Sequence, residues 1–138
     1  MADILPFRGV RYDAAKAGAP LADLVAPPYD VISSDEQDAL YARNPANVVR
    51  LILGREQDKY ENANRLFRKW LADGTLAADP AASLYVYRQT FRDPLTGKLA
   101  PERIGLVCLL KLEEYSTGGV LPHEKTLTGA KADRLDLL

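Results

Sequence analysis

The residues best suited to chemistry lie close together near the end of the chain, in residues 122–134. This segment holds the only histidine of the sequence, and with it side chains that carry positive charge, negative charge or a hydroxyl around one glycine: His123, Glu124, Lys125, Thr126, Gly129, Lys131, Asp133 and Arg134. Lysine and arginine neutralise phosphate or carboxylate oxygens, and histidine and glutamate move protons near neutral pH. The residue types therefore predict an anion-binding site.

The position of the glycine strengthens this prediction. Thr128-Gly129-Ala130-Lys131 stands where a loop meets the start of a helix predicted over residues 131–138, and a helix start presents unpaired N–H groups and partial positive charge to an anion. Gly129 allows a close backbone approach, and Lys131 and Arg134 share one helix face. The pattern is not a true P-loop, because the spacer after a first glycine is missing and no serine or threonine follows the lysine.

The individual roles stay open at this level. His123 is suited to general acid–base chemistry or to metal ligation, but one histidine does not compose a zinc site. Glu124 and Asp133 could relay a proton or hold Mg²⁺ through oxygens and waters. The alternative is a solvated loop whose charges pair with one another.

Asp30 is a second candidate carboxylate, and it fits a metal-binding role. It follows Pro27-Pro28-Tyr29, in which each proline fixes its own φ and pushes the preceding residue out of the α region. The segment must therefore be a rigid extended or turned loop, which is what a functional side chain needs. The alternative role for Asp30 is turn or cap stabilisation before Ser33.

Two helices are predicted between these candidate sites. Ser33 and Glu36 form a capping box for a helix that ends near Arg43. Asp58 with Glu61 repeats this pattern at the start of a second helix, in which apolar residues fall on one face before Gly74 ends it: Ala63, Leu66, Phe67, Trp70 and Leu71.

Strands are predicted in the remaining apolar segments. Residues 9–12 and 21–25 could form short strands, and the β-branched run 47–53 predicts a strand buried on both faces. Residues 84–91 and 102–115, joined by Asp93-Pro94-Leu95-Thr96-Gly97, predict a β-hairpin. The expected fold class is α+β, with a mixed or antiparallel sheet, one hairpin and two to three helices, in a single domain over residues 1–138.

Composition limits the function classes. The chain has 138 residues, of which 47% are hydrophobic, and 18 basic against 19 acidic residues give a net charge of −1. This balance gives no electrostatic reason to expect binding to nucleic acid or to an acidic membrane. We expect no signal peptide or membrane-spanning run, because the first residues lack a basic and apolar leader pattern and no apolar stretch approaches about 20 residues. A lone Cys108 in an apolar run is expected to be buried and inert. We therefore expect a cytoplasmic protein; its oligomeric state is not assigned.

Several distinctive motifs follow one another along the chain: Pro6-Phe7-Arg8-Gly9, Ala26-Pro27-Pro28-Tyr29-Asp30-Val31-Ile32, Asn47-Val48-Val49-Arg50-Leu51, Pro122-His123-Glu124-Lys125-Thr126, and Gly129 with Lys131-Ala132-Asp133-Arg134-Leu135. Together they resemble a known bacterial and archaeal family, the domain of unknown function 1015. The resemblance runs from about Leu5 to the end of the chain, with alanine at position 130 where the family usually has proline. Because family members are several-fold longer, we expect the chain to be their N-terminal portion and the helix at Leu135 to continue beyond it.

A more distant likeness is to the ParB and sulfiredoxin superfamily, whose members bind nucleotide phosphates at a loop-to-helix start and include a free-serine kinase. It implies a nucleotide such as ADP or ATP, and a link to serine and phosphoserine metabolism. We expect a protein that binds a phosphorylated small molecule or nucleotide and transfers or hydrolyses the phosphoryl group. In this hypothesis Lys125, Thr126, Gly129, Lys131 and Arg134 bind phosphate, His123 or Glu124 moves the proton, and Asp133 and Asp30 hold Mg²⁺.

Two alternatives belong to other classes. The same residues would also serve a non-catalytic ligand sensor or a nucleic-acid-associated binding module. The chain could also be a scaffold for a site completed by further residues, since active sites often lie between parts of a chain.

Overall fold

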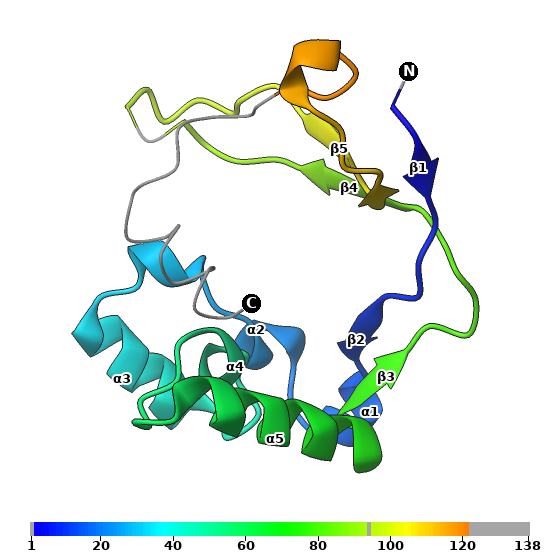
Figure 1. Ribbon diagram of the computed structural model, residues 1–138. Coiled ribbons are helices and arrows are strands. Elements are labelled where there is room, and N and C mark those ends of the chain that lie inside the picture. Colours follow the sequence, from blue (N-terminus) through cyan, green and yellow to red (C-terminus); the bar gives the residue numbers. More distant parts are fainter. Residues whose placement is uncertain (1, 94, 122–138) are drawn as a thin grey trace. The chain divides into compact units, whose positions relative to one another are not determined.

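The computed structural model describes residues 2–93 and 95–121 (Figure 1). These residues form an α+β protein, as predicted, with five α-helices and three two-stranded antiparallel sheets in the described part. They divide into two compact units, residues 10–78 and residues 2–9 with 79–121. The predicted single domain spans both units and stays a prediction.

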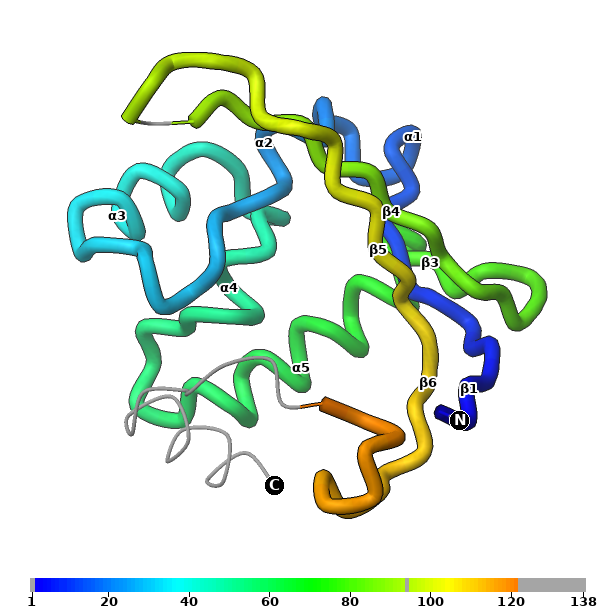
Figure 2. The backbone as a smooth tube through the Cα atoms, turned by 90° about the horizontal axis from the view of Figure 1, so that it is seen from above, coloured from blue at the N-terminus to red at the C-terminus, as the bar shows by residue number. Residues whose placement is uncertain are grey.

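The helices all belong to the unit of residues 10–78. Its α4 contacts both α3 and α5, and Figures 1 and 2 show these three helices as neighbours. Strands β2 and β3 pair antiparallel, with Arg11 opposite Ala77. The elements are β2 (Val10–Tyr12), α1 (Ala14–Ala17), α2 (Leu21–Leu24), the 3₁₀ turn η1 (Tyr29–Val31), α3 (Ser34–Arg43), α4 (Val49–Ile52), α5 (Lys59–Ala72) and β3 (Leu76–Ala78).

The apolar core of the described residues lies in this same unit. Each of four helices and one strand contributes one fully or nearly buried side chain, and the Tyr12 and Trp70 rings lie 6.3 Å apart beside them. Burial of such side chains is the main favourable term in folding. The buried hydrophobic residues are Leu24, Leu40, Val49, Trp70 and Leu76.

Both predicted helices are present. In α3 the Ser33 hydroxyl accepts a hydrogen bond from the Glu36 N–H at 3.3 Å, which is the N-cap half of the predicted capping box. The reciprocal bond from the Ser33 N–H to the Glu36 carboxylate is not formed in this part of the chain. Helix α5 ends before Gly74, whose φ of 82° is the left-handed conformation that glycine adopts without strain. The predicted Asp58 cap is wrong in one respect, because its side chain makes no capping hydrogen bond.

The strand predicted over residues 47–53 is wrong, because this segment contains helix α4. Asn47 is completely buried and its side-chain Oδ1 accepts a hydrogen bond from the Val49 N–H at 2.9 Å, which starts the helix. The Asn47 Nδ2 donates to the carbonyl oxygens of Asp23 and Val25 at 2.8 and 3.0 Å. These long-range bonds outweigh the β propensity of the valines.

The strand predicted over residues 21–25 is wrong for a related reason. These residues form the single helical turn α2, in which the Val25 N–H donates to the Leu21 carbonyl at 3.1 Å. Pro20 precedes the turn, and its φ of −63° suits a helix start. Asn47 then binds the carbonyls at the end of the turn, so residues far apart in sequence hold it in place.

The second unit contains only strands and a short turn among its described residues. The predicted hairpin is present, with Tyr87 opposite Gly105. The second strand is shorter than predicted, because the chain leaves the hairpin at Cys108 and then pairs with the N-terminal strand. Cys108 is half-buried, so the prediction that it is fully buried is wrong. The elements are β1 (Ile4–Leu5), β4 (Tyr85–Gln89), β5 (Arg103–Val107), β6 (Leu109–Leu110) and the 3₁₀ turn η2 (Tyr115–Thr117).

The turn between β4 and β5 is closed by Asp93. Its Oδ1 accepts hydrogen bonds from the N–H groups of Leu95 and Thr96 at 2.8 and 2.9 Å. The Thr96 and Leu95 N–H groups stabilise the charged carboxylate and hold the pKa of Asp93 below its usual value. This Asx turn and the left-handed Gly97, at φ 67°, are the turn chemistry that the sequence predicted.

The motif Phe7-Arg8-Gly9 is fixed by a polar network within the same unit. The Tyr85 hydroxyl donates to the Asp79 carboxylate at 2.6 Å and accepts from the Gly9 N–H at 2.7 Å. The Arg8 Nε–H donates to the Asp79 carbonyl at 2.6 Å. A Cβ at position 9 would lie 2.7 Å from the Tyr85 hydroxyl oxygen, so the network itself requires glycine there.

Candidate functional site

One of the predicted site residues, Asp30, lies in the described part of the chain. The residues predicted to bind phosphate or move protons lie outside it, as does the helix predicted over 131–138, and their roles stay predictions: His123, Glu124, Lys125, Thr126, Gly129, Lys131, Asp133 and Arg134.

Asp30 lies in the 3₁₀ turn η1, where the sequence predicted a rigid loop. Pro28 precedes the turn with a φ of −54°, and its carbonyl accepts a hydrogen bond from the Val31 N–H at 3.1 Å. The Asp30 side chain is exposed and makes no side-chain hydrogen bond or ion pair with another described residue. It does not cap α3, because Ser33 fills that position.

The structure also brings together residues that the sequence did not single out for binding. Arg50 and Arg55 lie at the ring of Tyr41, with their guanidinium carbons 4.2 and 4.0 Å from its centroid. Arg50 also donates from Nη2 to the Tyr41 carbonyl at 2.8 Å. We call Tyr41, Arg50 and Arg55 the arginine–tyrosine cluster. Cation–π contact of this kind fixes the orientation of a guanidinium.

Two carboxylates border the cluster. Asp38 forms an ion pair with Arg55, and Glu56 accepts a hydrogen bond from the Arg55 backbone N–H at 3.0 Å. Burial, and then the charge of Glu56, raise the pKa of Tyr41, and the nearby N–H of Arg55 and the two guanidinium groups only partly oppose this. Tyr41 is therefore a neutral phenol around pH 7.

Two polar atoms of the cluster are buried without a hydrogen-bond partner in the described part of the chain. They are the Arg50 Nε and the Tyr41 hydroxyl oxygen. The Arg55 N–H approaches the phenol closely enough to affect its pKa but not in the geometry of a hydrogen bond. Buried donors are nearly always paired in native proteins, so an unpaired guanidinium N–H is an uncommon feature.

The sequence did hold a signal for this cluster. Arg50 interrupts the apolar run Val48-Val49-Arg50-Leu51-Ile52, and a strand buried on both faces would have no place for an arginine side chain. Read as a strand, the run gave Arg50 no partner. As helix α4 it places Arg50 against Tyr41 of α3.

Other features of the described residues are less suited to chemistry. In residues 2–93 and 95–121, no group of three or more histidine, cysteine, aspartate or glutamate side chains could hold a metal ion. None of the helices in this part is long and apolar enough to cross a membrane.

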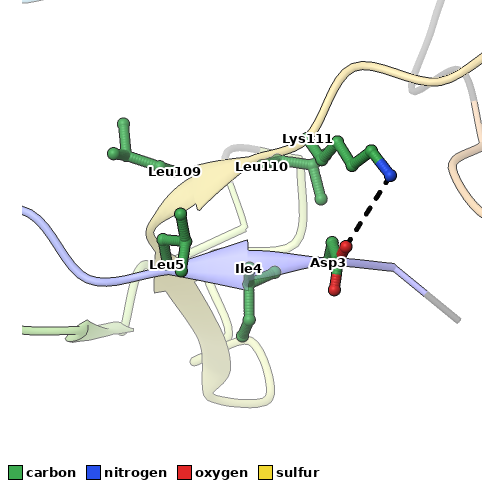
Figure 3. A pocket seen from close by; sticks show the side chains of 6 residues that line it. All are labelled: Asp3, Ile4, Leu5, Leu109, Leu110 and Lys111. Atoms are coloured by element: carbon green, nitrogen blue, oxygen red, sulfur yellow. Dashed lines mark ion pairs between the residues drawn. The ribbon is translucent and has the colours of Figure 1, made fainter.

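A cavity of about 380 Å³ lies against β1 and β6 (Figure 3). Aliphatic side chains dominate its lining, and Lys111 and Asp3 form an ion pair at 3.8 Å at one end of it. Because both side chains of that ion pair are largely exposed, the pair contributes little to the stability of the protein. The residues that line the cavity are Asp3, Ile4, Leu5, Leu109, Leu110 and Lys111.

The fold and the polar groups described above define an α+β protein with an exposed carboxylate and an arginine pair in its helical unit. The chain belongs to the family described as Protein of unknown function (DUF1015), whose sequence pattern matches residues 4–138. This confirms the family resemblance read from the motifs. No curated protein and no solved structure matches the chain.

Proposed function

We propose that this protein binds a phosphorylated small molecule or a nucleotide such as ADP or ATP, and that it transfers or hydrolyses the phosphoryl group. The compartment that fits is the cytoplasm, since the single cysteine of the chain gives no intrachain disulfide. Phosphoryl transfer needs positioning and charge neutralisation more than covalent help from the protein.

The observation that carries the proposal is the concentration, in residues 123–134, of side chains of the types that bind phosphate. Lys125, Lys131 and Arg134 supply positive charge, and Gly129 precedes the predicted helix start. Family membership supports the reading of this segment as a motif but adds no activity of its own.

Asp30 supports the metal part of the proposal. An exposed carboxylate on a short proline-fixed turn, with no competing partner among the described residues, suits Mg²⁺, which keeps several waters and takes one or two protein carboxylates. Asp133 would be the second carboxylate. His123 or Glu124 would then take the proton from the attacking group.

Ligand binding is tested by thermal shift of the protein with nucleotides and phosphorylated amino acids, with and without Mg²⁺. A ligand present at a hundred times its Kd stabilises the folded state by about 2.7 kcal/mol, which is a readily measured rise in Tm. Lys131→Ala should weaken binding at least about tenfold, as the loss of one charge-assisted phosphate contact predicts. Lys98→Ala, at an exposed hairpin lysine, is the matched control. Equal affinity in both variants would refute the role of Lys131.

Metal dependence is tested with Asp30→Asn. This change should remove the additional stabilisation that Mg²⁺ gives to nucleotide binding, and should leave metal-free binding unchanged. Asp58→Asn, at an exposed aspartate whose side chain caps nothing, is the control. A Mg²⁺ effect that survives Asp30→Asn would exclude Asp30 as a ligand.

Turnover separates a catalyst from a sensor. A catalyst converts a phosphorylated metabolite in the presence of Mg²⁺, and His123→Ala lowers kcat more than it lowers affinity. A sensor releases the same ligand unchanged. Binding without turnover would therefore retain the ligand class and discard the reaction.

A further inference from the structure

The β4–β5 hairpin has one packed face and one open face. On the packed face the Tyr85 ring lies 5.1 Å from the ring of Phe7, and the Tyr85 hydroxyl donates to the Asp79 carboxylate. Successive residues of a strand point to opposite faces, so the open face carries Val86, which lies opposite Leu106 in the strand pair. A two-stranded hairpin is marginally stable at best in water, and further packing on its open face would stabilise it.

The open face is aliphatic. Val86 is 66% exposed, Ile104 is 68% exposed and Leu106 is 47% exposed. Leu84, one residue before β4, continues the same alternation and is 46% exposed. The buried hydrophobic side chains of the described residues all belong to the unit of residues 10–78. The hairpin therefore exposes to water an apolar surface whose burial would be favourable.

One ion pair lies on the same face. The Arg88 Nε and Nη2 donate to the two carboxylate oxygens of Glu102 at 3.0 and 2.9 Å, and Arg88 lies opposite Ile104 in the strand pair. Because the pair has no net charge, it does not attract a strongly acidic or basic partner, and it does not repel a second copy of the same surface. We call this surface the hairpin face; it consists of Leu84, Val86, Arg88, Glu102, Ile104 and Leu106.

We propose that the hairpin face is the contact surface of a homodimer, in which two copies of the chain pack these faces together as the two sheets of a β-sandwich do. An apolar and neutral surface is complementary to itself, as a two-fold symmetric interface requires. Each of the six side chains exposes on the order of 100 Å², so two copies would bury about 1,200 Å² in all, which is the lower end of the range for specific interfaces. The dimer is therefore weak, with a Kd in the micromolar range, and it does not depend on phosphate binding.

The direct test is sedimentation equilibrium of the folded chain between about 1 and 100 µM. The average mass should rise with concentration from that of one chain towards twice that value. Ile104→Lys, at the most exposed aliphatic side chain of the face, should remain a monomer throughout, because the dimer would bury unpaired ammonium groups. Leu21→Lys is the matched control, at a leucine of α2 that is 58% exposed, and should associate as the wild type does.

Two results of this experiment overturn the inference. One is a wild-type chain that stays monomeric at about 100 µM, which is well above the expected Kd. The other is a folded Ile104→Lys variant, checked by circular dichroism, that associates as strongly as the wild type. A mass that keeps rising beyond two copies also contradicts it, because a two-fold interface closes on itself.

Methyl NMR of the unsubstituted chain locates the contact without relying on a variant. The signals of Val86, Ile104 and Leu106 should shift as the protein concentration rises through the Kd, whereas the signal of Val49, which is completely buried in the helical unit, should stay in place. Concentration-dependent shifts confined to residues outside the hairpin face would show that the chain associates through another surface. That result would overturn the assignment of the hairpin face even if a dimer forms.

Discussion

Asn47→Asp should destabilise the protein severely, although it replaces one atom and keeps the shape of the side chain. The buried Asn47 side chain accepts one hydrogen bond from Val49 and donates two, to the carbonyls of Asp23 and Val25. An aspartate can still accept from Val49. It cannot donate to the other two groups while it is ionised.

The magnitude follows from the two abandoned carbonyls. Both hydrogen bonds are part-buried, so each acceptor left without its donor costs about 1–2 kcal/mol, and the two together cost about 2–4 kcal/mol at neutral pH. A buried carboxylate adds to this. Because native proteins are stable by only about 5–15 kcal/mol, the loss is a large part of the total. The carboxyl is protonated and can donate one bond below about pH 4, so the deficit should be smallest there.

The assay is urea denaturation followed by far-UV circular dichroism, at pH 7 and at pH 4. Asn64→Asp is the matched control, because Asn64 is exposed on α5 and only accepts from Arg68 at 3.1 Å. The control should change stability by less than about 0.5 kcal/mol. A loss below about 1 kcal/mol for Asn47→Asp at pH 7 would refute the view that this side chain organises α2 and α4.

Three further changes test the packing of both units. Tyr85→Phe removes the hydroxyl that bridges a backbone N–H and a buried carboxylate, and should cost about 1–3 kcal/mol in urea denaturation, whereas Tyr87→Phe should cost almost nothing; equal costs would contradict the bridge. Gly105→Ala places a Cβ into the Tyr87 ring that lies across the strand pair, so it should cost about 1 kcal/mol, and unchanged stability would exclude that contact. Burial raises the pKa of Tyr12, which donates to the Ala46 carbonyl at 2.7 Å, to about 12. The contribution of the Tyr12 phenol to stability is complete below pH 10, which is its pKa in the unfolded chain, and is lost between about pH 10 and 12. Tyr12→Phe should therefore reduce the loss of stability over this pH range, and an unchanged dependence of stability on pH would refute the raised pKa of Tyr12.

Local signals predicted the elements whose ends are built from neighbouring residues. Ser33 and Gly74 mark the start of α3 and the end of α5, and Asp93 closes the hairpin turn with its own side chain. In each case the stabilising partner lies within a few residues in the sequence. A reading of propensity and spacing therefore identifies such elements correctly.

The errors occur where distant residues decide the structure. Val48 and Val49 favour a strand by propensity, but Asn47 joins their segment to Asp23 and Val25 and starts a helix instead. The arginine–tyrosine cluster was missed for the same reason, because it forms only once that segment is helical and packed against α3. The chemical types of residues 123–134 and of Asp30 could be read from the sequence. Their spacing along the chain does not tell whether these side chains lie close together in space.

The most direct test of the central claim, that this protein binds phosphate groups, is a calorimetric titration of the folded chain with ADP and Mg²⁺ at low salt. Saturable one-to-one binding that weakens with added salt, and that weakens further in Lys131→Ala, is the predicted result. Absence of saturable binding for both ADP and inorganic phosphate at millimolar concentration, with the protein folded, would contradict it.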